Sequence, residues 1–179
     1  MVWENLLLLK RVETLARVDS LTGVLNRREF EARFEAERSR ALRSQGPCSL
    51  LVLDIDGFKQ VNDRQGHAAG DDVLRRLGAL LQQTVRSHDT LARFGGDEFV
   101  VLLPDTPGDH VAQAAVRIGA LARHAGISVS IGGATWPTDC ADLTQLFAVA
   151  DRNLYRAKNA GRGRACFGAA EPRVIGAAW

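Results

Sequence analysis

Apolar residues recur along the chain with periods that change from segment to segment, and each period predicts an element. Residues 48–56, CSLLVLDID, form a nearly continuous apolar run, which is typical of a strand covered on both faces in the middle of a sheet. Apolar residues at helical spacing over 73–85 and 108–124 predict two amphipathic helices. A similar stripe over 143–160 predicts the last helix, and Gly161 is suited to end it.

Glycines and capping residues mark where other elements begin and end. Within 88–104, the runs HDTLARF and DEFVVLLP lie on either side of the glycine pair 95–96. Glycine adopts the positive φ angles that a tight hairpin requires, so we expect a strand, a two-residue turn at this pair and a second strand. Asn26 followed by Glu29 resembles a capping box, which predicts a helix from there to about Leu42.

The order of the predicted elements indicates the fold class. After the N-terminal helices come a strand, helices, the hairpin, a helix, a strand at 127–136, the last helix and an edge strand near 163–169. This order contains the split βαββαβ core of ferredoxin-like domains. We therefore expect an α/β protein of the α+β kind, with a central, mostly antiparallel, five-stranded sheet flanked by helices. A chain of 179 residues suits one domain, placed at 19–170, with a tail at 171–179.

The first 18 residues predict a separate helix. Leu8, Val12 and Leu15 have the four-then-three spacing of a coiled-coil seam over barely two heptads. The helix is therefore either the stub of a coiled-coil stalk or a helix that packs on its own domain. Four consecutive leucines before Lys10 are too few for a signal-peptide core or a membrane span.

Composition narrows the class of protein. With 23 basic and 21 acidic residues the net charge is +2, which gives no global field that would favour a nucleic acid polymer or a membrane as partner. The three cysteines lack a CxxC pair, which argues against a disulfide framework or a zinc site and favours a cytoplasmic location; they are Cys48, Cys140 and Cys166.

Four carboxylates are candidates for one cluster. Asp54 and Asp56 end the strand at 48–56, and Asp97 and Glu98 follow the glycine pair. If the hairpin pairs beside that strand, these groups converge at one sheet edge, where they need a cation. Oxygen ligands select magnesium or manganese over zinc, and magnesium suggests a phosphate substrate. The alternative is that Asp54 and Asp56 cap the helix that follows and that Asp97 and Glu98 are solvent-facing turn residues.

Phosphate groups would need basic partners as well. The chain has no G-x-x-x-x-G-K-[ST] loop, which excludes a P-loop nucleotide site. Lys158, Arg162 and Arg164 lie near the end of the last predicted helix. The alternative is a solvated helix end whose cations complement the helix dipole.

The pentapeptide GGDEF at 95–99 resembles the signature of bacterial diguanylate cyclases, which condense two GTP molecules into cyclic di-GMP and release pyrophosphate. The resemblance extends from Asp19 to about Phe167. It is carried by four further motifs in order, DSLTGVLNRR, DIDGFKQVND, GHAAGDDVL and ADRNLYRAKNAGRGR. Gly163 stands where the family commonly has asparagine, and Gly57 where it often has a larger residue.

This resemblance implies a two-metal site. Two Mg²⁺ (or Mn²⁺) ions per active site would be held by the carboxylates of Asp54, Asp97 and Glu98 and by the backbone carbonyl of Ile55. Asp97 and Glu98 are accordingly the catalytic candidates. Asp97 is also the candidate acceptor for the proton of the attacking 3′-hydroxyl, although the metal could make a dedicated base unnecessary.

The resemblance also implies a GTP site. Asn62 and Asp71 would read guanine, and a carboxylate is a sound acceptor for the guanine N1 and amino hydrogens. The phosphates would contact Lys59, Lys158 and Arg162. The glycines Gly95 and Gly96 would let the backbone come close to the nucleotide.

The chemistry implies a homodimer, because each domain would hold one GTP and the two domains must face each other. The N-terminal helix would then be a signalling helix that joins the domain to an upstream sensory domain and raises the effective concentration of its partner.

The family also has a product-binding inhibitory site a fixed distance before GGDEF, and RSHD at 86–89 lies at that distance in this chain. Arg86 and Asp89 would bind cyclic di-GMP there, with Arg117 as a secondary contact, because guanidinium groups suit phosphates and guanine edges. The alternative is a local ion pair or turn.

Two other functions compete with the cyclase. One is a catalytically silent module that binds GTP or cyclic di-GMP and acts through a partner, although a silent module has no need to keep Asp54, Asp97 and Glu98. The other is a related nucleotide cyclase or polymerase-like domain, which Asn62 and Asp71 together disfavour.

Overall fold

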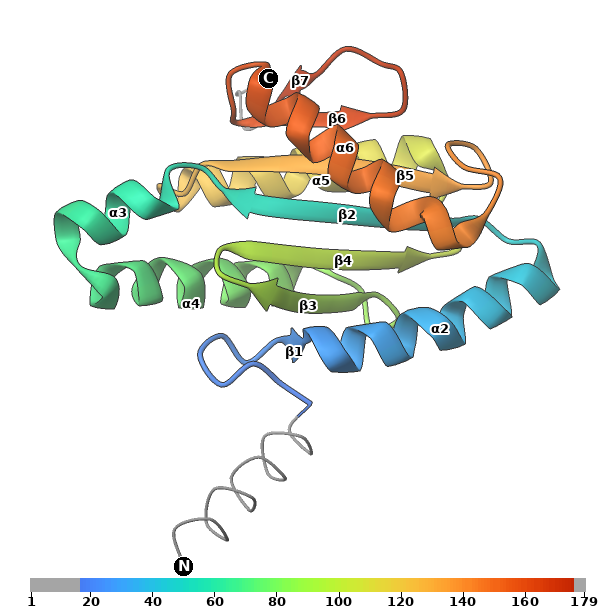
Figure 1. The fold of residues 1–179 in the computed structure, drawn as a ribbon, viewed down its shortest axis with the longest axis horizontal. Helices are drawn as coiled ribbons and strands as arrows, with labels where there is room; N and C mark the ends of the chain where they lie inside the picture. The colour runs from blue at the N-terminus through green and yellow to red at the C-terminus, as the bar shows by residue number, and fades with distance from the viewer. Residues whose placement is uncertain (1–16, 176–179) are drawn as a thin grey trace, which may run out of the picture.

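The computed structural model describes residues 17–175, which form a seven-stranded sheet in the order β1-β3-β4-β2-β5-β6-β7 with helices on both faces (Figure 1). The strands are β1 (Leu25–Asn26), β2 (Cys48–Ile55), β3 (Thr90–Gly95), β4 (Glu98–Pro104), β5 (Val129–Trp136), β6 (Arg164–Phe167) and β7 (Arg173–Val174). The helices are α2 (Arg27–Ser44), α3 (Phe58–Gln65), α4 (His67–Thr84), α5 (Gly108–His124), the short 3₁₀ helix η1 (Leu143–Gln145) and α6 (Leu146–Asn159).

The predicted fold class is confirmed. Strands β3, β4, β2 and β5 are adjacent and antiparallel, as a βαββαβ core requires, and β6 adds to β5 in parallel. The predicted number of strands is too low, because β1 pairs with β3 and β7 pairs with β6 at the two edges. Each of these has two residues, which is too short to show a period of two in the sequence.

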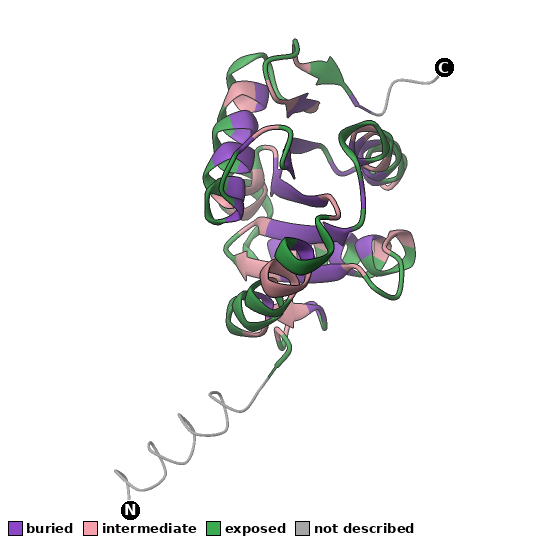
Figure 2. Cartoon of the chain, turned by 90° about the vertical axis from the view of Figure 1, so that its right-hand side faces the viewer, coloured by how far each residue is buried: buried purple, intermediate pink, exposed green. Residues whose placement is uncertain are grey.

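Strand β2 lies at the centre of the sheet, and helices cover both of its faces. All eight of its residues are buried. Leu51, Leu53 and Ile55 pack with α4 and α5 on one face, and Leu50 and Val52 pack with α2 and α6 on the other. Figure 2 shows the buried residues gathered on the strands and on the helix sides that face them. The continuous apolar run of β2 is thus explained by burial on both faces of the sheet, as predicted.

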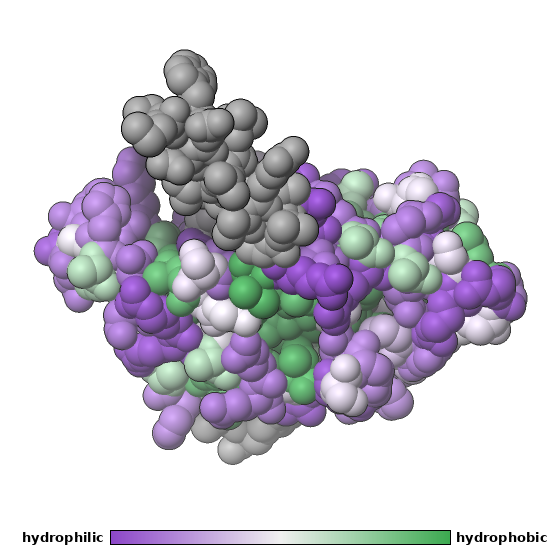
Figure 3. Space-filling model, turned by 90° about the horizontal axis from the view of Figure 1, so that it is seen from below, coloured by the Kyte–Doolittle hydropathy of each residue, from purple (hydrophilic) through white to green (hydrophobic). Residues whose placement is uncertain are grey.

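Apolar side chains also reach the surface. Seen from below in Figure 3, hydrophobic residues gather in a hollow between hydrophilic ones. Separately, α2, β3 and α6 contribute phenylalanines to a cavity of about 210 Å³, where the rings of Phe94 and Phe147 stack with centroids 5.3 Å apart.

Helix α2 begins as predicted. The Glu29 N–H donates to Asn26 Oδ1 at 3.0 Å, and the helix continues to Ser44, two residues beyond the expected end. Gln45 follows it in the left-handed conformation, with φ 53°.

The hairpin turn lies one residue later than predicted. Gly95 pairs with Glu98, so that the two turn residues are Gly96 and Asp97 rather than the glycine pair. A register shift between Arg93 and Gly95 accounts for the difference, because it adds one residue to β3. Gly95 and Gly96 both have positive φ, at 138° and 52°.

Other expectations fall partly outside the described residues. The predicted helix at 1–18 lies almost wholly there, as does the end of the predicted tail. The domain boundaries therefore stay predictions. Between residues 17 and 175, no helix is both long and apolar enough to cross a membrane.

Candidate active site

Strands β2 and β4 place two carboxylates directly opposite each other. The register pairs Asp54 with Glu98. Side chains alternate along a strand, so Asp54 lies on the same face as Leu50 and Val52, the face that α2 and α6 cover. Like charges directly opposite destabilise an antiparallel pair. This arrangement therefore requires a cation.

Lys158 supplies one positive charge from the last turn of α6. Its Nζ lies 2.7 Å from Asp54 Oδ2. Burial raises the pKa of Asp54, the hydrogen bond from Lys158 lowers it, and the charge of Asp97 raises it further, so that the pKa is above its usual value. The ionised carboxylate is thus only partly compensated by Lys158. A divalent cation would stabilise the ionised form.

The carboxylate pair fits a magnesium site that a substrate completes. Among residues 17–175, no three His, Cys, Asp or Glu side chains are grouped closely enough to hold a metal ion by themselves. Magnesium usually takes one or two protein carboxylates and obtains its other ligands from water and substrate phosphates. Asp54 and Glu98 provide the hard oxygen ligands that Mg²⁺ and Mn²⁺ prefer.

The hairpin turn, Gly96–Asp97, is held by Arg93 and β2. Arg93 Nε and Nη2 donate to the Gly96 carbonyl at 3.1 and 2.7 Å, and its Nη1 donates to both carboxylate oxygens of Asp19 at 3.1 and 3.3 Å. The Ile55 N–H donates to the Asp97 carbonyl at 3.4 Å. The sequence pattern did not predict this role of Arg93. The only sign of it was that Asp19 begins one of the motifs.

Asp56 does not join the carboxylate cluster, which corrects the prediction made from the strand pattern. Its Oδ1 accepts from Ser130 Oγ at 2.7 Å. Its Oδ2 accepts from Ser128 Oγ at 2.7 Å and from the Gly163 N–H at 2.9 Å. Both oxygens are thus occupied by protein donors. Asp56 ties the end of β2 to β5 and to the loop after α6.

Asn62 on α3 lies against Gly70 of α4, the residue before Asp71. The Oδ1 of Asn62 is buried and has no hydrogen-bond partner among the described residues. A Cβ on Gly70 would overlap this oxygen, so the Asn62 side chain can hold this position only beside a glycine. A buried acceptor without a donor is costly. A ligand that brings N–H groups would remove this cost.

The predicted phosphate contacts lie on separate elements. Lys59 is exposed on α3, and Arg162 is exposed in the loop after α6. Arg162 has a φ of 60° between two glycines, Gly161 and Gly163, which also have positive φ. Glycine and asparagine tolerate this region best, which explains why either suits position 163. Arg164 is half-buried on β6, and its Nε has no hydrogen-bond partner among residues 17–175.

The RSHD segment forms a closed turn. The Asp89 N–H donates to the Arg86 carbonyl at 3.1 Å, and the Arg86 N–H donates to Asp89 Oδ2 at 2.7 Å. The other Asp89 oxygen is buried and has no hydrogen-bond partner in the described part of the chain, with His88 Nε2 3.8 Å away. Arg117 on α5 donates to the Thr84 carbonyl at 3.2 Å. Thr84 ends α4, two residues before Arg86, so the three predicted residues come from neighbouring segments.

Comparison with known proteins gives a consistent result. Residues 16–164 match the family described as diguanylate cyclase, GGDEF domain. The uncharacterized protein YhcK of Bacillus subtilis is 40% identical over 177 residues, which cover 90% of this chain and 48% of that protein. The diguanylate cyclase DgcM of Escherichia coli is 40% identical over 164 residues, which cover 87% of this chain and 39% of that protein. The chain thus spans about half, or less, of these relatives.

A solved structure agrees with the fold. The GGDEF domain of DgcB from Caulobacter crescentus, in complex with c-di-GMP, has a TM-score of 0.79 and 27% sequence identity. The match covers 86% of this chain and 94% of that chain. Asp54, Glu98 and the turn at Gly96–Asp97 therefore lie in a domain with the GGDEF fold. By its sequence and its fold, this chain belongs to the GGDEF-domain diguanylate cyclase family.

Proposed function

We propose that this chain condenses two GTP molecules into cyclic di-GMP and releases pyrophosphate. The proposal rests on the pairing of Asp54 with Glu98 on adjacent strands. Lys158 alone compensates only part of the negative charge at Asp54. A silent binding module would have no use for this costly arrangement. Because the chain spans about half of its relatives, the activity is proposed for the domain.

The metal site is proposed on Asp54, Asp97 and Glu98, with the Ile55 backbone carbonyl as a further ligand. Two Mg²⁺ ions there, or Mn²⁺ in their place, would polarise the α-phosphate and balance charge on the leaving pyrophosphate. Asp97 lies in the hairpin turn and is the residue proposed to accept the proton of the 3′-hydroxyl. Arg93 keeps this turn in position through the Gly96 carbonyl.

Guanine recognition is proposed for Asn62 and Asp71. The unpartnered Oδ1 of Asn62 can accept from a guanine N–H group, and the Asp71 carboxylate can accept from the N1 and amino hydrogens. Adenine presents no hydrogen at N1, so it would leave an acceptor unpaired. We therefore expect GTP to be strongly preferred over ATP.

The triphosphate is proposed to contact Lys59, Lys158 and Arg162. Lys158 forms an ion pair with Asp54, and cations bound to that carboxylate would free its ammonium for a phosphate. The backbone at Gly95 and Gly96 is exposed, and a Cβ added at either position would meet no atom within 4 Å, which leaves room for the nucleotide.

Each domain holds a single guanine site in this proposal, so the active species is a homodimer in which one bound GTP attacks the other. The test is to remove bound nucleotide, add GTP and Mg²⁺ at rising protein concentration, and measure pyrophosphate and cyclic di-GMP. A rate that rises faster than linearly with protein supports a dimeric cyclase. GTP binding without product, even after forced dimerisation, would instead support the silent module.

Arg93→Ala is expected to lower kcat about tenfold with little change in KM for GTP, because a displaced hairpin turn costs transition-state alignment rather than binding. Steady-state kinetics at saturating Mg²⁺ measure both constants. Arg75→Ala, an exposed arginine on α4, is the matched control. An equal loss in both variants would contradict the positioning role of Arg93.

Asp19→Asn is expected to destabilise the protein at neutral pH by about 1 kcal/mol or less, as for other partly exposed ion pairs. Burial opposes ionisation of Asp19, but hydrogen bonds from Thr22 and Arg93 outweigh it and lower the pKa of Asp19. A lowered pKa stabilises the fold above the unfolded-state pKa, and this contribution is lost as pH falls through the folded-state pKa. Urea unfolding should therefore show a difference at pH 7 that vanishes in acid.

Product inhibition is proposed at Arg86, Asp89 and Arg117. Arg86→Ala is expected to raise the cyclic di-GMP concentration for half inhibition about tenfold, the loss of one charge-assisted contact. Titrating product into the turnover assay measures this. Ser87→Ala, the exposed neighbour, is the control. Unchanged inhibition in Arg86→Ala would show that the product acts elsewhere.

A further inference from the structure

The loop after α6 holds Arg162 in a conformation that non-glycine residues rarely adopt. Gly161, Arg162 and Gly163 have φ angles of 113°, 60° and 56°. A side-chain-bearing residue stays in the left-handed region only where its surroundings fix the backbone on both sides. The contacts of this loop therefore decide where the Arg162 side chain begins.

Three elements fix the loop. The Arg162 N–H donates to the Ala157 carbonyl on α6 at 3.3 Å. The Gly163 N–H, which belongs to the peptide unit after Arg162, donates to Asp56 Oδ2 at 2.9 Å. The Gly163 carbonyl accepts from the Ile175 N–H at 3.1 Å. Two of these contacts come from α6 and from the residue after β2, and the third comes from the segment that follows β7.

Ile175 is itself firmly placed. It is 2% exposed and belongs to the core cluster of α4 and α5. A Cβ on Gly119 of α5 would lie 2.6 Å from the Ile175 Cβ, so glycine there permits the close packing. The Ile175 N–H is thus held at the Gly163 carbonyl by a buried side chain rather than by strand pairing alone.

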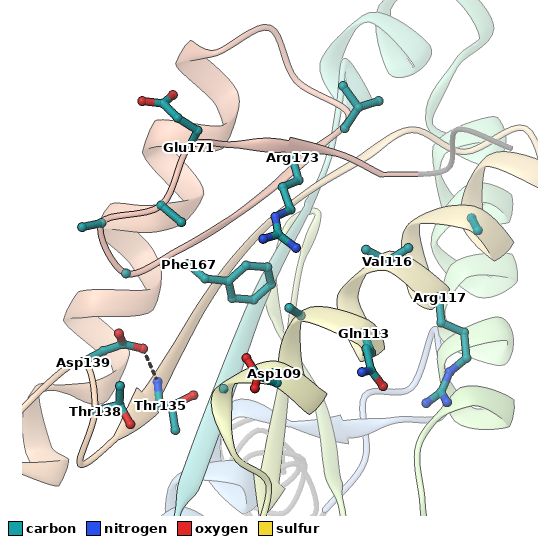
Figure 4. A pocket seen from close by; sticks show the side chains of 17 residues that line it. Asp109, Gln113, Val116, Arg117, Thr135, Thr138, Asp139, Phe167, Glu171 and Arg173 are labelled. Carbon is teal, nitrogen blue, oxygen red and sulfur yellow. Dashed lines mark hydrogen bonds between the residues drawn. The ribbon is translucent and has the colours of Figure 1, made fainter. Parts of the chain in front are cut away.

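The rest of the β6–β7 hairpin is less closely packed on α5. A cavity of about 1040 Å³ separates them, with Phe167 and Arg173 on the hairpin side and Asp109 and Gln113 on the helix side (Figure 4). Ile175 follows this hairpin and contacts α5 directly. It therefore anchors the end of the hairpin to the domain.

The family match ends at residue 164, so that most of the hairpin and Ile175 lie beyond it. We propose that segment 173–175 positions Arg162 for the triphosphate of GTP, with Ile175 as the positioning residue acting through the Gly163 carbonyl. This inference rests on the proposed function, because it needs Arg162 to contact the phosphates. The simpler alternative is that the segment only stabilises the sheet edge.

The two alternatives differ in what happens when Arg162 is removed. Ile175→Pro deletes the N–H that Gly163 accepts. It is expected to raise the Kd of α,β-methylene GTP in Mg²⁺ about tenfold in the otherwise unchanged protein, since small misplacements of a binding group are costly. In an Arg162→Ala background, the same change should leave the Kd unaltered, because nothing remains to be positioned.

A second variant keeps the test decisive if Ile175→Pro does not fold. Gly119→Ala pushes on Ile175 from α5 and leaves its N–H in place, so a smaller rise in Kd is expected that also disappears without Arg162. Gly108→Ala on the same helix is the matched control, because its Cβ would meet Thr135 Oγ1 at an ordinary 3.6 Å. Thermal unfolding of each variant shows whether the domain remains folded at the assay temperature.

Each outcome decides between the alternatives. A rise in Kd of equal size with and without Arg162, or a lower Tm with unchanged Kd in both Ile175→Pro and Gly119→Ala, would overturn the proposal. An unchanged Kd in Arg162→Ala alone would overturn it too, by removing the phosphate role. Failure of the proposed cyclase function is distinguishable, because it appears as absence of cyclic di-GMP from the unaltered protein, which this binding assay does not measure.

Discussion

Asp54→Asn is expected to lower the turnover of GTP about a thousandfold, the scale of losing a principal electrostatic contribution to a transition state. The amide has nearly the shape of the carboxylate but lacks its charge, so it would hold a divalent cation poorly. Asn62 and Asp71 are untouched, so guanine recognition should remain. Cyclic di-GMP formation in Mg²⁺ measures the first effect, and nucleotide competition between GTP and ATP measures the second.

The same variant should not lose stability without metal. Burial raises the pKa of Asp54, which means that its ionised form costs folding free energy above the folded-state pKa. This cost disappears below the unfolded-state pKa, where Asp54 is protonated in both states. The Tm of metal-free Asp54→Asn should therefore equal or exceed that of the unaltered chain at pH 7, and the two should converge in acid.

A control variant tests whether the loss of any carboxylate charge lowers turnover, or only the loss of the charge at Asp54. Asp109→Asn makes the same change at an exposed position on α5 and should leave turnover within about twofold, as for surface changes elsewhere. If Asp54→Asn kept full turnover, the metal site would have to be assigned to other residues. If it lost turnover only by unfolding, the Tm at pH 7 would fall.

The position of the carboxylate pair could be predicted from the sequence because it depends on strand order. An apolar run ending in Asp54 and a hairpin beginning near Glu98 are both visible as patterns, and a βαββαβ order makes the two strands neighbours. The exact register was not predictable in this way, because the turn lies one residue later than the glycine pair indicated and does not itself fix how β4 pairs with β2. The N-cap at Asn26 was predictable for a different reason, since the donor and the acceptor of its bond are three residues apart in the chain.

Other features depend on contacts that have no local pattern. Asp56 was grouped with Asp54 because a single residue separates them in the chain, but Ser128 and Ser130 arrive from β5 and the residue before it and occupy the Asp56 oxygens. Arg93 similarly owes its role to Asp19, which is 74 residues away in the chain. Such pairings are fixed by tertiary packing, so spacing along the sequence does not reveal them.

The site as a whole is built on contacts that reach it from other parts of the fold. Asp56 and Arg93 bind no substrate in this proposal, yet one fixes the loop that carries Arg162 and the other fixes the turn that carries Asp97. The residues proposed to have direct chemical roles are recognised by their motifs, whereas the residues that hold them in place are identified only from the fold. Substitution of Asp56 or Arg93 should displace the proposed site residues, whereas substitution of a proposed metal or substrate contact should remove a chemical group from the site.

Gly70→Ala is expected to raise the KM for GTP by about a hundredfold, the scale on which misplacing a recognition group acts. Its Cβ would overlap Asn62 Oδ1 and would also lie 3.1 Å from Phe58 Cζ, so the Asn62 amide must leave its position. Alanine is the better helix former, which offsets part of the strain. The loss should therefore appear in KM more than in Tm, as measured by steady-state kinetics and thermal unfolding.

A double variant tests whether the effect passes through Asn62. Asn62→Ala removes the overlapping oxygen, so Gly70→Ala added to it should raise the KM little further, and the two changes should be strongly non-additive. Gly108→Ala again serves as the control for a glycine with room for a Cβ. Full additivity would mean that Gly70 acts on GTP by another route, and a KM unchanged by Gly70→Ala would show that the contact between α3 and α4 does not shape the guanine site.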